Sequence, residues 1–210
     1  MSEYNREQLE SLAAVRRHLA ALDPAEIRAL AAGLQDYLAF RASVDAFQAE
    51  HFGAVCTAAC YQSRLSACCT REGIITFFAD VVVNALQSAA AELDRLAHAL
   101  QRPNVGLKCV YLGPDGCLWR VKPIVCQMFL CDQAQNRVFA ARPDLKQDWE
   151  AFGERKKRFT WPDRPVLFDD LEAFFMHRGC RTALMYLHNS PGLLRVKQCR
   201  GGCRNGNRIR

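Results

Sequence analysis

The chain has 210 residues, half of them hydrophobic, with a formal net charge of +6 and eleven cysteines. This length is enough for one substantial core. Neither a signal-peptide core nor an apolar run long enough to span a bilayer is visible, so a membrane protein is excluded and a cytoplasmic one is expected. The whole charge excess lies in six basic residues of the last twenty. We therefore expect a single helical domain over 1–190 and a basic Gly/Arg-rich tail over 191–210.

Two helices are predicted at the beginning of the chain. Leucine and alanine recur at helical spacing over 5–22. Asp23 suits an N-cap and Pro24 the first helical position, so the second helix should run from Pro24 to about Gln48. The two helices are expected to form an antiparallel hairpin over the cysteine segment. The inward positions of the second helix are Ile27, Leu30, Leu34, Leu38 and Phe47.

A long apolar segment over 74–100 predicts a helix that is buried nearly all round. Asp80 and Asn84 interrupt its apolar run and, being four residues apart, lie on one side of the helix. A buried polar side chain needs a partner. We expect these two side chains to hydrogen-bond either to the cysteine loops, where they would support the metal ligands, or simply to the backbone of a loop. The second alternative is favoured.

A short β-hairpin is predicted next, with strand-like residues 109–112 and 117–121 on either side of the turn 113–116. Pro123 should end the second strand and begin a helical turn that contains Cys126. Further helices are expected over about 143–158 and after Asp169-Asp170. The predicted fold class is thus mainly α, with a small hairpin and irregular cysteine-rich loops gathered around a metal site.

Cysteines are unusually dense between residues 56 and 131. In a reducing compartment structural disulfides seldom persist, and an odd total of eleven fits complete pairing poorly, so a metal site is favoured. Zinc, iron and an iron–sulfur cluster such as 4Fe-4S all accept thiolate ligands. The candidate ligands are Cys56, Cys60, Cys68, Cys69, Cys109, Cys117, Cys126 and Cys131.

Local geometry supports this set. Cys56 and Cys60 are four apart, which places both on one side of a helical turn, and Cys109 and Cys117 flank a hairpin turn that brings them together. The adjacent residues Cys68-Cys69 point in different directions. A cluster with several irons, or two nearby ions, would use both, whereas a single ion would use one and leave the other packed as a small hydrophobe.

The segments CTAACYQSRLSACC and KCVYLGPDGCLWRVKPIVC resemble the bacterial YkgJ-like cysteine-cluster family of zinc- or iron-chelating proteins. The resemblance covers about a third of the chain and rests on the double cysteine 68–69, the step 116–119 and the step 123–126. Lys122 stands where the family usually has arginine. Gln127 stands where the family often has a basic residue, directly after the last cysteine of the motif. Relatives include flagellin lysine methylases, whose similar motif is associated with an iron–sulfur centre. The resemblance therefore implies thiolate metal binding, and it carries over no reaction.

Other candidates are weaker. His177 precedes Cys180 by three residues and His51 precedes Cys56 by five, while Cys199 and Cys203 lie in the tail. No phosphate-binding glycine loop, metalloprotease helix or nucleophile elbow is present, so no catalytic residue is assigned and a non-enzymatic role is favoured. The basic tail over 191–210 also suits weak contact with nucleic acid, although aromatic residues for base stacking are absent from it.

Three hypotheses follow from the sequence. The first is a metal-binding protein that holds zinc or iron through thiolates. The second is an iron–sulfur enzyme or an electron-transfer component of a modification pathway. The third is a zinc-stabilised protein whose tail contacts nucleic acid. Metal content and colour of anaerobically purified protein distinguish iron from zinc.

Overall fold

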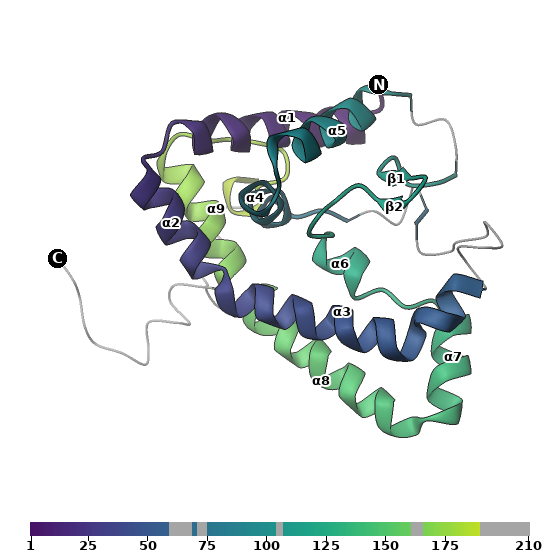
Figure 1. Ribbon diagram of the computed structural model, residues 1–210. Helices are drawn as coiled ribbons and strands as arrows, with labels where there is room; N and C mark the ends of the chain where they lie inside the picture. Colours follow the sequence, from purple (N-terminus) through teal and green to yellow (C-terminus); the bar gives the residue numbers. More distant parts are fainter. Residues whose placement is uncertain (59–68, 71–74, 104–106, 161–165, 190–210) are drawn as a thin grey trace, which may run out of the picture.

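The computed structural model describes residues 1–58, 69–70, 75–103, 107–160 and 166–189. Helices dominate these residues, and two very short strands form an antiparallel hairpin (Figure 1). The elements are α1 Glu3–Ala20, α2 Pro24–Gly33, α3 Gln35–Cys56, α4 Phe78–Gln87, α5 Ala90–Gln101, β1 Leu112–Gly113, β2 Gly116–Cys117, α6 Ile124–Gln127, α7 Asp132–Ala141, α8 Pro143–Thr160, α9 Leu167–His177 and α10 Tyr186–Asn189. The predicted mainly helical class with a small hairpin is confirmed.

The N-terminal helices differ from the prediction. Asp23 is indeed an N-cap: its side chain accepts the Glu26 N–H at 2.8 Å, and Pro24 is the first residue of α2. The expected second helix, however, is divided at Leu34 into α2 and α3. The expected hairpin is also wrong, because α1 packs mainly against α4 and α5 (Figure 1). Leu34 and Phe47 are buried as predicted, whereas Ile27, Leu30 and Leu38 are only half-buried.

The expected helix over 74–100 is likewise two helices. Ser88 and Ala89 are extended, with φ/ψ of −104°/147° and −69°/156°, and they separate α4 from α5. The break is stabilised because the Glu92 carboxylate accepts the Ala89 N–H at 2.7 Å and so caps α5. The apolar pattern predicted one helix since Ser88 and Ala89 are both compatible with helix and no Gly or Pro marks the break.

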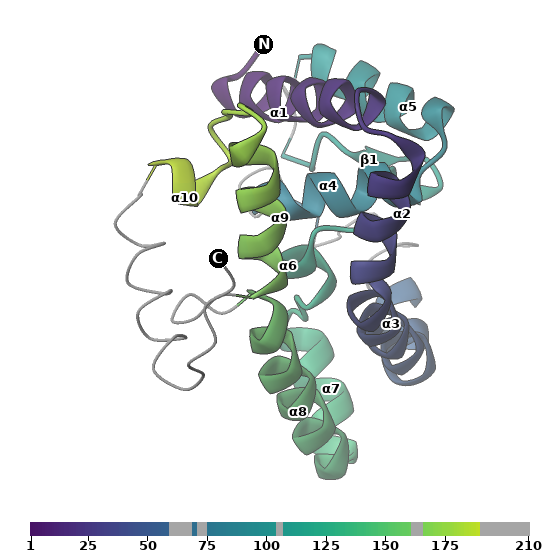
Figure 2. The same cartoon turned by 90° about the vertical axis from the view of Figure 1, so that its left-hand side faces the viewer.

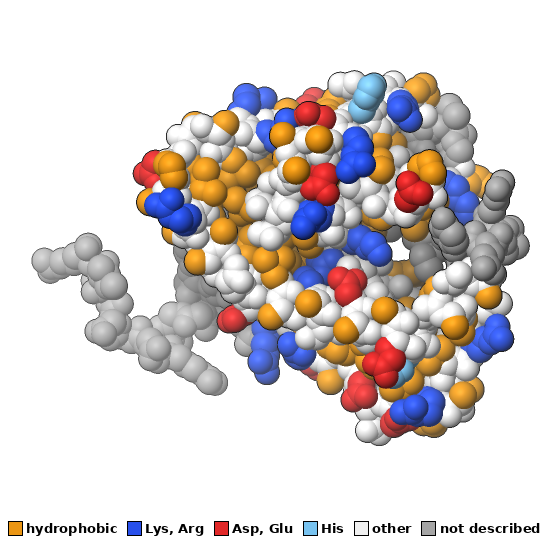
Figure 3. Space-filling model, viewed as in Figure 1, with side chains coloured by type: hydrophobic (Ala, Val, Ile, Leu, Met, Phe, Trp, Pro, Cys, Tyr) orange, Lys and Arg blue, Asp and Glu red, His pale blue; other side chains and the backbone are white. Residues whose placement is uncertain are grey.

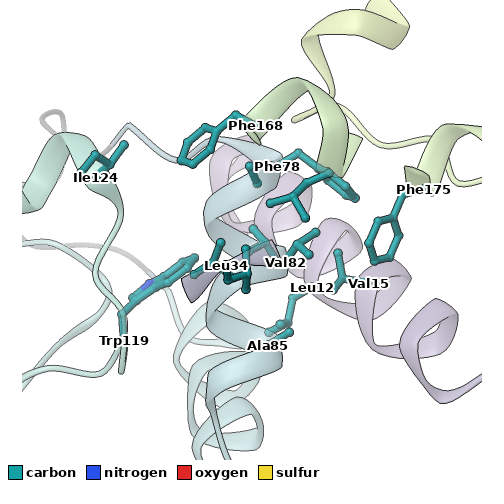
Figure 4. Close-up of a cluster of buried hydrophobic side chains, with 14 of the residues drawn as sticks. Leu12, Val15, Leu34, Phe78, Val82, Ala85, Trp119, Ile124, Phe168 and Phe175 are labelled. Carbon is teal, nitrogen blue, oxygen red and sulfur yellow. The ribbon is translucent and has the colours of Figure 1, made fainter. Parts of the chain in front are cut away.

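A main core surrounds α4, whose residues from Phe78 to Ala85 are all buried. It receives side chains from α1, α2–α3, α5, α9 and the segment that follows the hairpin. Figure 4 shows Trp119 and Ile124 of that segment directed toward α4, opposite Phe175 of α9. The cysteine-bearing loops are therefore fixed on one side by the main core.

A second, smaller cluster lies between α3, α7 and α8, with Phe52 1% exposed at its centre. Figure 2 shows α7 and α8 side by side below the rest of the molecule, next to α3. The helix predicted over 143–158 is α8, and its residues Trp149 and Phe152 pack against both the second cluster and the main core. The other members of this cluster are Phe47, Leu130, Ala134, Val138 and Leu145.

Candidate metal centre

A pocket of about 1050 Å³ lies between the cysteine loops and the second half of α3. Figure 3 shows the surface hollowed here, beside residues that are not described. Its walls include the hairpin, α6 and the beginning of α7. Six of the eight predicted ligands line this one pocket, namely Cys56, Cys69, Cys109, Cys117, Cys126 and Cys131.

Backbone pairing brings Cys69, Cys109 and Cys117 together, and Cys126 lies close enough for the sulfurs of Cys69 and Cys117 to raise its pKa. We call Cys69, Cys109, Cys117 and Cys126 the first thiol group. Thr70 forms an antiparallel bridge with Lys108, and the Cys109 N–H donates to the Cys69 carbonyl oxygen at 3.0 Å. The hairpin pairs Leu112 with Cys117, which returns the chain toward Cys109 as the sequence predicted. Three separate stretches of chain thus converge.

The hairpin turn depends on one glycine. Gly116 has φ +113°, a conformation that residues with a Cβ rarely adopt, and it closes the turn after Pro114 and Asp115. Pro123 then precedes the single helical turn α6, which carries Cys126 as predicted.

Backbone amides act on three sulfurs of the first thiol group. The Tyr111 N–H donates to Cys109 Sγ at 3.4 Å. The backbone amides of Trp119 and Ile75 lower the pKa of Cys117 and that of Cys126, respectively. Such bonds favour the thiolate over the thiol and are typical of sulfurs that bind metal.

The metal-free site still favours neutral thiols. Burial, with a contribution from the neighbouring sulfurs, raises the pKa of Cys109 to about 12 and that of Cys126 to about 11, against the amide hydrogen bonds that act the other way. Burial also raises the pKa of Cys117, although the Trp119 amide and the Lys122 ammonium oppose it. The sulfurs are therefore close enough for negative charge on one to raise the pKa of a neighbour. A cation between them would offset this repulsion between thiolates.

Asp80 and Asn84 hold the loop that carries Cys126, as expected for polar groups that bond loop backbone. Asp80 is 2% exposed, and its Oδ1 accepts the Ile124 N–H at 3.0 Å. Asn84 Oδ1 accepts the Val121 N–H at 2.9 Å. Burial raises the pKa of Asp80 to about 6, and the amide hydrogen bonds and Arg41 oppose the rise. Two positions of α4 thus fix the chain between Cys117 and Cys126.

A second set of polar contacts, from α3, was missed by the sequence analysis. Arg41 is 4% exposed and donates to the Lys122 carbonyl at 2.6 Å and to Gln127 Oε1 at 2.8 Å. Gln127 also donates to Asp45, and Gln48 donates to the Gln127 carbonyl at 2.7 Å. The signal was available in the pattern: Arg41 follows buried Tyr37 and Phe40 on the inward face of the helix. A charge at such a position indicates a specific buried partner.

Cys56 and Cys131 form what we call the second thiol pair, on the opposite side of the pocket. Cys56 ends α3 and Cys131 is the N-cap of α7, and both pack against the second cluster rather than the main core. Of the six pocket cysteines, Cys109 and Cys117 thus pack against the main core, and Cys56 and Cys131 pack against the second cluster.

The other candidates from the sequence either fall outside the described residues or lie elsewhere in the fold. Cys60, Cys68, Cys199 and Cys203 lie outside the described residues, as does the tail over 191–210. Cys180 is 1% exposed in the main core, whereas His177 is exposed at the end of α9. His51 packs edge-on against Phe47, with ring centroids 4.7 Å apart, and lies 3.7 Å from Glu50.

The donor set of the first thiol group has the chemistry of a metal site. Four sulfurs suit soft or borderline ions and iron–sulfur clusters better than cations that prefer oxygen ligands. As they stand, no three His, Cys, Asp or Glu side chains in the described part of the chain are arranged so that they could hold a metal ion. Coordination therefore needs the thiols to turn further toward one another.

Two further observations define the class of protein. No disulfide joins two of the cysteines that the structure describes. Of the helices in the described ranges, none combines the length and apolarity needed to cross a bilayer. The chain is thus a mainly helical protein with a pocket lined by six cysteines.

Comparison with known proteins does not add a family to this description. No family model, curated protein or solved structure matches the chain.

Proposed function

We propose that this protein binds a metal through the first thiol group, holding either zinc or iron, the iron as an ion or as an iron–sulfur cluster. The observation that carries the proposal is the convergence of Cys69, Cys109, Cys117 and Cys126 on one wall of the pocket, where neighbouring sulfurs contribute to the raised pKa of Cys109, of Cys117 and of Cys126. Inert core cysteines need neither mutual proximity nor amide donors.

The chemistry of binding follows from the same contacts. Each thiol loses its proton when it binds, so four thiolates bring four negative charges, more than a divalent ion cancels. The Lys122 ammonium, which already lowers the pKa of Cys117, and the amides of Tyr111, Trp119 and Ile75 offset part of that excess. In this proposal the chain supplies the ligands and part of the counter-charge.

Metal analysis of anaerobically purified protein tests the proposal. Stoichiometric zinc in colourless protein, or iron in brown protein with a broad visible band, is the expected result. Single Cys→Ser changes at each position of the first thiol group should let a competing chelator take metal that the wild type retains, whereas Cys180→Ser, a buried cysteine of the main core, should not. Full metal content in all four variants would overturn the ligand assignment.

The pocket gives one reason to keep an iron–sulfur enzyme or electron carrier as a second candidate. A volume of about 1050 Å³ is far more than an ion occupies and lies in the range of small-molecule sites. A reversible change of the visible spectrum on anaerobic reduction would support this candidate. Zinc-containing protein that does not respond to reductant would refute it.

A further inference from the structure

We infer that Asp80 and Arg41 act together as positioning residues of the first thiol group, by holding the turn that carries Cys126 from two opposite sides. This inference rests on the proposed metal binding and deepens it. Both side chains are almost completely buried, 2% and 4% exposed, and neither lines the pocket. They therefore act on the site through the backbone between them and not by touching a bound metal.

The Asp80 carboxylate joins two segments that meet at Cys126. Its Oδ2 accepts the Phe77 N–H at 3.0 Å, which fixes the chain just before α4, and its Oδ1 accepts the Ile124 N–H at 3.0 Å, which fixes the first residue of α6. The backbone amide of Ile75, two residues before Phe77, lowers the pKa of Cys126, two residues after Ile124. One carboxylate thus fixes the chain next to this amide and next to this sulfur.

Arg41 holds the same turn through hydrogen bonds to two of its oxygen atoms. One guanidinium nitrogen, Nη2, donates both to the Lys122 carbonyl at 2.6 Å and to Gln127 Oε1 at 2.8 Å, so the contacts fall on either side of Cys126. Arg41 Nη1 is itself fixed by Tyr37 Oη at 2.8 Å. The turn from Lys122 to Gln127 is therefore held by two charged side chains. The Asp80 carboxylate accepts one of its amide N–H groups, and the Arg41 guanidinium donates to two of its oxygen atoms.

Burying two charges is costly unless each is well bonded, and an apolar pair of similar volume would often serve stability better. Directional bonds to chosen backbone atoms are what charged groups supply and apolar ones do not. The arrangement fits a demand for position, because a thiolate site tolerates little displacement of its ligands.

Asp80→Asn tests the inference, and Asp169→Asn is its matched control. Asp169 is 1% exposed and accepts the Val166 N–H at 3.0 Å at the beginning of α9, so it has the same capping role. Its other described hydrogen bond goes to Tyr186, away from the cysteines. Both variants lose charge and part of a helix cap, but only Asp80→Asn disturbs the turn of Cys126.

The measurement is a titration of reduced, metal-free full-length protein with Co²⁺, followed by its sulfur-to-cobalt charge-transfer absorption. We expect Asp80→Asn to raise the Kd about tenfold, the lower end of what partners behind metal ligands contribute. The absorption per bound cobalt should also fall, since one sulfur is displaced. Asp169→Asn should leave both quantities within about twofold of the wild type. Equal behaviour of the two variants would overturn the inference.

Two additions keep the result decisive. If Asp80→Asn does not fold, Arg41→Gln removes the other hydrogen bonds that hold the turn of Cys126. This variant should likewise raise the Kd and lower the absorption per bound cobalt. If the wild type binds no cobalt, the proposed function fails, and alkylation of Cys126 in the metal-free protein decides the inference alone. Faster alkylation of Cys126 in both Asp80→Asn and Arg41→Gln than in Asp169→Asn supports the positioning role, because the two changes alter the local charge in opposite directions. Faster alkylation in Asp80→Asn alone, which the loss of a charge that raises the pKa of Cys126 explains, or equal rates in all three variants refute it.

Discussion

The first thiol group and the second thiol pair line the same pocket but are supported in different ways. The first group lies on loops that are fixed by polar side chains of α3 and α4 and anchored in the main core by Trp119 and Ile124. Cys56 and Cys131 instead stand at the ends of α3 and α7, against the second cluster. The difference teaches that a high density of cysteines does not by itself define a site. The site is defined by the hydrogen bonds that fix the backbone around the cysteines.

The largest effects are expected when a buried ring is removed from each hydrophobic cluster separately. Phe78→Ala in the main core and Phe52→Ala in the second cluster remove rings that are 0% and 1% exposed. Each should lower the free energy of unfolding by about 3–5 kcal/mol. Only Phe78→Ala should also weaken metal binding, because α4 holds the loop of Cys126. Denaturant unfolding and metal titration measure the two effects, and equal loss of metal in both variants would contradict the division.

Ligand substitutions sharpen the comparison. Cys117→Ser should weaken metal binding about 100-fold, since about 10–16 kcal/mol of binding free energy shared by four ligands leaves about 3 kcal/mol for one. Cys131→Ser should leave the affinity of the first thiol group nearly unchanged. Competition with a chelator gives both values. Loss of affinity in Cys131→Ser as large as in Cys117→Ser would show that the two groups hold one shared centre.

The pH dependence is a smaller effect, of about 1.4 kcal/mol per pH unit for each proton released. The pKa of Cys109, about 12, and that of Cys126, about 11, lie above the ordinary value of 9.0, so these thiols are protonated at neutral pH and binding must release their protons. Metal affinity should therefore rise as pH rises. Without metal the opposite holds for stability: the contribution of these thiols is complete below pH 9 and is lost as pH rises through about 11–12. Titrations at several pH values with and without metal check both signs.

Much of the fold and part of the site could be predicted from the sequence. Helical spacing gave α1 and α8, the Asp23-Pro24 pair gave the beginning of α2, and the turn 113–116 gave the convergence of Cys109 and Cys117. Asp80 and Asn84 were recognisable because polar residues interrupt an apolar helix. Each of these signals is local in the chain.

What could not be predicted depends on contacts between distant residues. The bridge between Thr70 and Lys108, which sets Cys69 beside Cys109, joins two segments with no turn signal between them. The packing of α1 on α4 and α5 depends on which of several apolar faces meet, and sequence periodicity does not specify the partner. For the same reason the part played by Arg41 became visible only with its partners in place.

The central position of α4 has a consequence for how the protein is made. It packs against α1 from the beginning of the chain and against α9 near its end (Figure 1). During synthesis α4 therefore waits for residues up to His177 to leave the ribosome before its surface is fully covered. Until then the backbone around Cys126 has an incomplete support, so we expect capture of metal to follow translation rather than accompany it.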